Sequence, residues 1–314
     1  MIPYIHVPDL HLFGLTVHPF GLLVATGVII GTALATRRAR GRGFDLDKLN
    51  SFITWMLVAG FVGGHVLDEI FYHPSEILKD PLSLLKLWAG LSSFGGFTGA
   101  LIGIVLWKYF YSKPIVQIGP LSIPGFYKRK QVQPVLPFAD VVLAVFPVAW
   151  IFGRAGCSVV HDHPGARAPA DALLAVAYGR GPSTHYGPIE LFMGNAPQYD
   201  LGLLELMFTI VLAGLLALTW RRKLPTGTYV YVTSLAYAPV RFAMDFLRVR
   251  DIEGADPRYA ALTPAQWACV ALFTFGIIVF LYVRKLVKTG QDPARLVQAN
   301  AAANDGPTAD AASA

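Results

Sequence analysis

Residues 19–36 read PFGLLVATGVIIGTALAT, an uncharged stretch that ends at Arg37 and Arg38. A helix needs roughly 20 mostly apolar residues to cross the hydrocarbon core of a bilayer. Apolar stretches of this length that stop at paired arginines are typical of membrane spans, because Lys and Arg gather on the cytoplasmic side. This stretch therefore predicts a first membrane-spanning helix, and the rest of the chain can be compared with it.

The composition agrees with a membrane protein. Only 15% of the 314 residues are charged, 54% are hydrophobic, and the mean hydropathy is +0.49. Soluble domains carry about 25% charged residues. The balance excludes intrinsic disorder and, with two cysteines, a small disulfide scaffold. It also argues against an ordinary soluble enzyme, and we attribute the net charge of +6 to membrane topology rather than to nucleic-acid binding.

Six more apolar stretches follow the first. They cover residues 49–67, 87–107, 135–153, 201–220, 227–247 and 265–283. We therefore predict an all-α, polytopic membrane protein with about seven transmembrane helices.

Two segments do not fit the helical pattern. Residues 154–200, between the fourth and fifth helices, are rich in Gly, Pro, His and Ala. They are too polar to span and too long for a turn, so we predict an external, loop-rich head region. Residues 1–288 are expected to form one transmembrane domain. The Ala- and Asp-rich segment 289–314 is expected to be a disordered cytoplasmic tail.

The distribution of basic residues predicts the orientation. With the N-terminus outside, the segments on the inner side hold 17 Lys and Arg residues and those on the outer side hold 8. This asymmetry favours an external N-terminus and a cytoplasmic C-terminus. It also places the head region outside.

The sixth helix carries ionisable residues inside an apolar stretch. Tyr237, Arg241 and Asp245 in SLAYAPVRFAMDFLRVR follow one another at intervals of four, so they lie on one face of a helix. Ionisable groups at membrane depth are costly and mark functional sites. The spacing is equally compatible with a structural ion pair between Arg241 and Asp245.

A second group follows the fourth helix, which ends in GRAGCSVVHDHPG. The planar guanidinium of Arg154 matches a phosphate group, and His161 and His163 could exchange protons. The alternative is that Arg154 reaches the lipid headgroups and that the histidines form a hydrated turn with Asp162. We expect no metal here, because the two histidines and Asp162 would supply a minimal ligand set, and Cys157 among apolar neighbours is expected to be inert.

Two further helices contribute polar or small residues. His65, Asp68 and Glu69 share one face at the end of the second helix. In the third helix, Gly95 and Gly96 begin a glycine stripe that suits close helix packing or the close approach of a lipid.

Taken together, these segments resemble the prolipoprotein diacylglyceryl transferase family over residues 14–285. The resemblance rests on the order and spacing of four motifs. They are HPFGLLVATGV at 18–28, GGHVLDEIFYHP at 63–74, GRAGC at 153–157 and YAPVRFAMDFLR at 237–248. GRAGC is similar to the family signature G-R-x-G-N, and the last motif to Y-G-x-x-R-x-x-x-E-F-x-R.

The resemblance implies an activity and partners. Family members lie in the bacterial inner membrane and transfer the diacylglyceryl group of phosphatidylglycerol to the lipobox cysteine of prolipoproteins, with no cofactor. By resemblance Arg154 and Arg241 clamp the phosphate, Tyr237 hydrogen-bonds near the reacting group, and Asp245 orients Arg241. Asp162 matches another acidic residue of the signature, and the bilayer and prolipoprotein signal peptides are the partners.

The chain departs from the family at the expected base. The third helix of the family carries S-F-H-G-G, whose His is the candidate base, and here Phe94 stands at that position. Cys157 replaces the signature Asn, and His65 replaces an Arg. His161 and His163 are the substitutes we expect, with His65 next. The alternative function is a non-catalytic membrane protein that binds or transports anionic lipid.

The charge asymmetry makes a testable prediction about topology. A reporter fused after Lys223 should be cytoplasmic, and one inserted near Gly181 should be external. Alkaline phosphatase activity paired with a cytoplasmic fluorescent reporter measures both. A cytoplasmic Gly181 fusion contradicts the topology.

Overall fold

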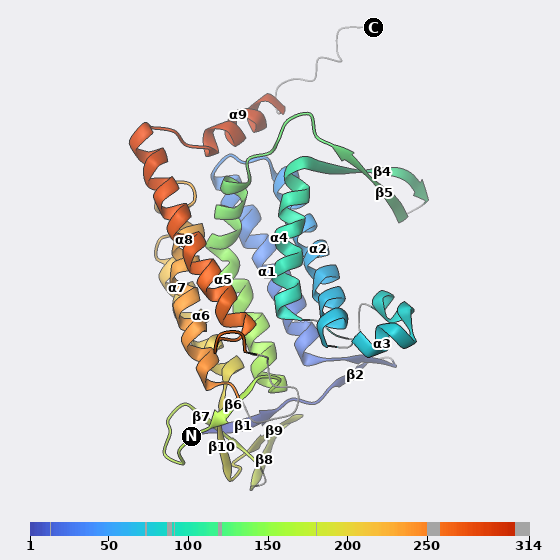
Figure 1. The fold of residues 1–314 in the computed structure, drawn as a ribbon, viewed down its shortest axis with the longest axis vertical. Coiled ribbons are helices and arrows are strands. Elements are labelled where there is room, and N and C mark those ends of the chain that lie inside the picture. The colour runs from blue at the N-terminus through green and yellow to red at the C-terminus, as the bar shows by residue number, and fades with distance from the viewer. Residues whose placement is uncertain are drawn as a thin grey trace. The chain divides into compact units, whose positions relative to one another are not determined.

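The computed structural model describes residues 1–12, 14–72, 74–86, 90, 92–118, 121–179, 181–249 and 258–304 (Figure 1). Each of the seven predicted apolar stretches forms a helix. They are α1 (Pro19–Gly41), α2 (Leu46–Tyr72), α4 (Ser93–Tyr109), α5 (Val135–Val160), α6 (Leu201–Ala217), α7 (Thr228–Met244) and α8 (Pro264–Thr289).

Four of these helices are long and apolar enough to cross a membrane, by length and composition. They are α1, α2, α5 and α8. Helices α4 and α6 are apolar but shorter, and α7 carries the ionisable residues described above. The protein is thus a mostly helical chain of membrane-protein character.

Contacts divide the chain into two compact units. The first comprises Met1–Ala35 and Asp140–Gln291, and the second comprises Thr36–Ala139 and the segment from Asp292 onward. Helices α1 and α5 continue from one unit into the other. Each unit is described below by itself.

The first unit contains a six-stranded sheet at one end of helices α5–α8 (Figure 1). In spatial order the strands are β6 (Pro164–Arg167), β10 (Ala196–Asp200), β7 (Ala175–Tyr178), β1 (Ile2–His6), β9 (Ile189–Phe192) and β8 (Ser183–Tyr186). Strand β1 runs parallel to β7 and antiparallel to β9. A small hairpin of β2 (Leu10–Leu12) and β3 (Leu15–Val17) follows β1.

This sheet corrects the prediction of an all-α fold and a loop-rich head. The head region contributes five of the six strands, and these have only four or five residues each. Apolar alternation over four residues is too short to be distinguished from a loop. The pairing of β1 with segments far along the chain leaves no local pattern in the sequence.

Polar caps fix where two helices of the first unit begin. Asp200 ends β10, and its Oδ1 accepts a hydrogen bond from the Leu203 amide at 2.9 Å, which caps α6. Thr263 and Gln266 form a reciprocal capping box at the start of α8. Such caps satisfy amide groups that the first helical turn leaves without partners. Both capping side chains also take part in the site described below.

The second unit is built on the pair α2 and α4. The third predicted helix begins later than expected, at Ser93, with Ser92 as its cap, and is preceded by α3 (Pro74–Lys79) and the 3-10 helix η1 (Pro81–Leu85). A hairpin of β4 (Phe110–Ile118) and β5 (Leu121–Lys128) extends from the end of α4 (Figure 1). Trp107 packs edge-on against Phe52 and Phe138 in the core of this unit.

Glycines allow α2 and α4 to approach closely. A Cβ atom on Gly99 would lie 2.2 Å from the carbonyl oxygen of Ala59, and one on Gly95 would lie 2.5 Å from that of Gly63. Such contacts are shorter than side chains tolerate, so the small residues are needed for helix packing. Gly96 is less crowded, because its nearest neighbour of this kind is 3.9 Å away.

The C-terminal segment corrects another expectation. Disorder was predicted from residue 289, but α9 (Ala294–Asn304) is helical, with Ala294 and Val297 buried. The Gln298 amide donates a hydrogen bond to the Arg42 carbonyl oxygen at 2.8 Å. The Ala-rich composition that suggested disorder also has the highest helix propensity. Residues 305–314 lie outside the described part of the chain.

The glycine contacts predict that a Gly→Ala change lowers the stability of the protein at some helix positions and not at others. Gly99→Ala should lower the stability of the protein by about 1–3 kcal/mol, because α2 and α4 must move apart. Thermal unfolding in detergent measures this change. Gly214→Ala in α6 is the matched control: nothing lies within 4 Å of its added carbon, so it should be neutral or stabilising by up to about 1 kcal/mol. Equal effects of the two variants would contradict the packing role.

Candidate functional site

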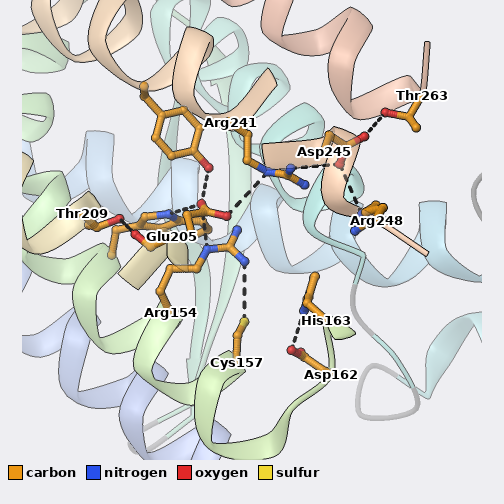
Figure 2. Close-up of polar contacts among 12 residues, drawn as sticks. Arg154, Cys157, Asp162, His163, Glu205, Thr209, Arg241, Asp245, Arg248 and Thr263 are labelled. Atoms are coloured by element: carbon orange, nitrogen blue, oxygen red, sulfur yellow. Dashed lines mark hydrogen bonds and ion pairs between the residues drawn. The ribbon is translucent and has the colours of Figure 1, made fainter. Parts of the chain in front are cut away.

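The carboxylate of Glu205, on α6, is surrounded by donor groups from α5 and α7 (Figure 2). Its Oε1 lies 2.9 Å from Nε of Arg154 and accepts hydrogen bonds from the Trp150 indole at 3.2 Å and from the Tyr237 hydroxyl. Its Oε2 lies 3.5 Å from Nε of Arg241. One buried carboxylate therefore holds both arginines that the sequence marked as phosphate clamps.

A second carboxylate, Asp245, continues this arrangement at the end of α7. Its Oδ1 accepts from Nη1 of Arg241 at 2.9 Å and lies 3.2 Å from Nε of Arg248. Its Oδ2 accepts a hydrogen bond from the hydroxyl of Thr263 (Figure 2). Because Thr263 caps α8, Asp245 links the beginning of α8 to the end of α7.

Two carboxylates hold three arginines in this group. We call Arg154, Arg241, Arg248, Glu205 and Asp245 the arginine network. Arg154, Glu205 and Asp245 are at most 5% exposed. Buried charges are tolerated when they are paired. The network therefore gathers guanidinium groups at one buried point, and their forked donors suit phosphate oxygens.

Next to Arg154 lie three side chains that can ligate a metal. Nη1 of Arg154 is 3.7 Å from the sulfur of Cys157. We call Cys157, Asp162 and His163 the Cys–Asp–His cluster, because their ligating atoms all lie within 4.8 Å of one another. The His163 ring also donates a hydrogen bond to Asp162 (Figure 2).

A backbone turn brings this cluster together. Helix α5 ends at Val160, and the next residue, His161, has a φ of +51°, in the left-handed region. This conformation turns the chain back over the end of α5. Asp162 and His163 therefore come beside Cys157 instead of continuing along the helix.

His161 itself is held in a different environment. Its Nδ1 lies 2.6 Å from Oδ2 of Asp200, and its Nε2 lies 2.9 Å from the carbonyl oxygen of Ile5. The ring also stacks on Tyr4, with the centroids 3.8 Å apart. Because both nitrogens face acceptors, neither is left to take a proton from a substrate. This geometry favours a structural role, in which His161 ties β1 and β10 to the end of α5.

Tyr178 completes the support of His161. Its hydroxyl donates to Oδ2 of Asp200 at 2.9 Å. Burial and the nearby Asp200 carboxylate raise the pKa of Tyr178, so the hydroxyl keeps its proton and remains a donor. Burial, with a smaller effect of Asp200, also raises the pKa of Tyr4.

Glu205, Trp150 and Arg248 are site residues that sequence reasoning did not select. Glu205 is the only acidic residue in the apolar stretch 201–220, which was the available signal. A lone carboxylate at membrane depth implies a cationic partner, but the sequence does not say which arginine that is. Only the fold brings α5, α6 and α7 to one point.

Comparisons with known proteins give the family. A family model described as prolipoprotein diacylglyceryl transferase matches residues 9–282. The chain belongs to this family. Relatives named phosphatidylglycerol–prolipoprotein diacylglyceryl transferase match most of the chain. One from Klebsiella pneumoniae is 26% identical, over 89% of this chain and 95% of its own. One from Neisseria gonorrhoeae is 27% identical, over 85% and 92%, and one from Cereibacter sphaeroides is 28% identical, over 81% and 86%.

Other residues selected from the transferase resemblance lie in the second unit. His65 is fully buried, with Nδ1 3.2 Å from the carbonyl oxygen of Gly90 and Nε2 3.1 Å from that of Ser83. These contacts favour a structural role for His65. Phe94, at the position of the family His, is half exposed on α4. Gly95 packs against α2, as described above.

The central position of Glu205 predicts a large stability effect. Glu205→Gln keeps the size of the side chain but removes the carboxylate that Arg154 pairs with, and it leaves Arg241 paired with Asp245. Breaking a buried pair in this way costs about 3–5 kcal/mol. Chemical or thermal unfolding in detergent measures the loss. Glu190→Gln is the control, because its partner His185 is exposed, and it should change stability by less than about 1 kcal/mol. A similar effect of both changes would contradict the central role of Glu205.

Proposed function

We propose that the protein transfers the diacylglyceryl group of phosphatidylglycerol to the lipobox cysteine thiol of prolipoproteins. The observation that carries this proposal is the arginine network, which holds the Arg154 and Arg241 guanidinium groups on one buried carboxylate among apolar helices. Phosphatidylglycerol carries one negative charge on its phosphodiester. The names of the relatives support the same reaction.

The chemistry requires cations at the phosphate. A thiolate attacks the glyceryl carbon that bears the phosphodiester, a carbon–sulfur bond forms, and the carbon–oxygen bond breaks. Glycerol phosphate leaves with the electron pair and gains a second negative charge. We assign Arg154 and Arg241 to the phosphate oxygens, where they stabilise the charge that develops in the transition state. Asp245 orients Arg241, and Tyr237 donates its hydrogen bond to Glu205, beside the guanidinium groups assigned to the phosphate.

The thiol must also lose its proton before it attacks. A cysteine with a pKa near 8.5 is only a few per cent thiolate at neutral pH. We assign thiol activation to Asp162 and His163, whose side chains are partly exposed. Both lie beside Cys157, which in turn contacts Arg154. His161 supports the site without taking part in proton transfer, because its two ring nitrogens are occupied.

We further propose the setting in which this site works. The seven helices cross the bacterial inner membrane, with the N-terminus outside and the C-terminus in the cytoplasm. Residues 1–288 form the transferase domain, and the head, residues 154–200, meets the signal peptide on the outer side. The 17-to-8 distribution of basic residues supports this orientation. Of the two glycines predicted to contact lipid, we assign this contact to Gly96, because an added Cβ would meet no atom closer than 3.9 Å, whereas Gly95 is packed against α2.

Phe94 favours a second candidate function. It stands where the family resemblance places a catalytic His, and a phenyl ring cannot accept a proton. A protein that binds or transports anionic lipid needs the arginines but no base. Complementation of a bacterial strain depleted of its own transferase separates the two functions. Growth with lipidated prolipoprotein supports the transferase, and lipid binding without growth supports the second candidate.

The phosphate contacts make a testable prediction. Arg154→Lys and Arg241→Lys keep the charge but lose the forked donors. Each should therefore lower the transfer rate by about tenfold or more. A tenfold loss corresponds to about 1.4 kcal/mol of activation free energy. Transfer of labelled diacylglyceryl to a lipobox peptide measures the rate. The exposed Arg222→Lys is the matched control and should keep full activity. Full activity in both clamp variants would rule out forked phosphate contacts.

A further inference from the structure

The Cys–Asp–His cluster has the donor set of a zinc site. It offers one thiol sulfur, one carboxylate oxygen and one imidazole nitrogen, all within 4.8 Å of one another. Catalytic zinc sites use three protein ligands of these types and leave a fourth position open. The sequence analysis predicted no metal here, because the motif offered only the two histidines and Asp162 as ligands. The structure brings Cys157, and not His161, to Asp162 and His163.

We propose that Cys157, Asp162 and His163 bind a Zn²⁺ ion, and that its open fourth position takes the thiol of the acceptor cysteine. The metal site is inferred from the positions of the three side chains alone. Its role in thiol activation rests on the proposed function. The ion would activate the acceptor thiol. By resemblance a histidine of the family performs this step, and Phe94 stands at its position here.

A zinc ion requires two adjustments: the hydrogen bond between His163 and Asp162 must open, and the more distant ligand atoms must approach one another. Zinc bonds of about 2.3 Å to sulfur and about 2.0–2.2 Å to nitrogen or oxygen place tetrahedral ligand atoms roughly 3.4–3.6 Å apart. The ligating atoms here are at most 4.8 Å apart. The side chains of His163 and Asp162 are 22% and 39% exposed, and Cys157 is buried. The cluster is therefore closed on the side of Cys157 and open on the side where a substrate thiol would enter.

The surroundings hold the ligands in place. His161 fixes the left-handed turn between Cys157 and the other two ligands through Asp200 and Ile5. Arg154 donates toward the sulfur of Cys157 at 3.7 Å, as an outer partner of a metal-bound thiolate does. The Arg154 guanidinium also lies between Cys157 of the cluster and Glu205 of the arginine network (Figure 2). A thiol on the ion and a phosphate on the network would therefore be adjacent.

The reaction balances without an oxidant or reductant. Zn²⁺ displaces the thiol proton of Cys157 when it binds, and a substrate thiol loses its proton to water when it coordinates the ion. The coordinated sulfur attacks the glyceryl carbon, and the carbon–oxygen electron pair leaves with glycerol phosphate. The thioether product carries no charge and is a weaker ligand, so it dissociates.

The proposal differs from general base catalysis in what it requires of Cys157. A His163–Asp162 base needs no sulfur and no metal. A zinc site needs all three side chains and loses its ion to a chelator. Cys269 offers a matched control, because it is the other cysteine of the chain and is also buried and free.

Cobalt binding tests the site without reference to activity. The full-length protein in lipid nanodiscs is stripped with a chelator and titrated with Co²⁺, which replaces Zn²⁺ and shows a thiolate charge-transfer band in the near ultraviolet. We expect one Co²⁺ per chain with this band. Cys157→Ser should abolish the band, and His163→Gln should weaken Co²⁺ binding by at least about 100-fold. Cys269→Ser should leave the band and the Co²⁺ affinity unchanged. Absence of the band in the unmodified protein overturns the site.

A second measurement tests the role of the ion. A peptide with a lipobox cysteine should strengthen the charge-transfer band, because a second sulfur joins the ion, and the same peptide with serine should not. The chelated protein should lose diacylglyceryl transfer and regain it with Zn²⁺. Full transfer by metal-free protein overturns the role in activation and leaves the site. Metal and peptide binding without any transfer by the zinc-loaded protein contradicts the proposed function instead.

Discussion

The site depends on the pairing of Glu205 with two arginines at a depth where unpaired charges are not tolerated. An apolar bundle can hold three guanidinium groups only when carboxylates compensate them. Glu205 and Asp245 supply this compensation from α6 and from the end of α7. The same pairing fixes where the guanidinium groups point. Under the proposed function, changes to these carboxylates should therefore affect stability and phosphate binding together.

The elements that the sequence predicted are those with long, local patterns. Apolar stretches of about 20 residues predicted the helices α1, α2 and α4–α8. Spacing placed Tyr237 and Arg241 on one helix face, and only the family resemblance added Arg154. All three contact Glu205, and their role in binding stays a prediction. What the sequence could not show is pairing between distant segments. The head sheet consists of strands of four or five residues, and a lone Glu205 does not indicate its partners.

The two histidines of the HDH motif show why residue type and spacing were not enough. They are two positions apart and chemically identical, yet His161 is held by Asp200 and Ile5, whereas His163 lies with Cys157 and Asp162. The difference comes from one left-handed backbone conformation at the end of α5. Composition alone also failed in α9, where alanine suggested a disordered tail although it favours helix.

The position of β1 has a consequence for how the protein is made. The first strand of the sequence lies in the middle of the sheet, between β7 and β9, and its Ile5 carbonyl holds His161. At roughly 5–20 residues per second, the ribosome needs about 9–35 s to proceed from β1 to the end of β7 at Tyr178, the first of its two partner strands to be made. During that interval neither partner strand is complete, and the helices between are made first. The head sheet is therefore assembled late in biogenesis, and a quality-control protease that samples nascent chains would meet β1 unprotected.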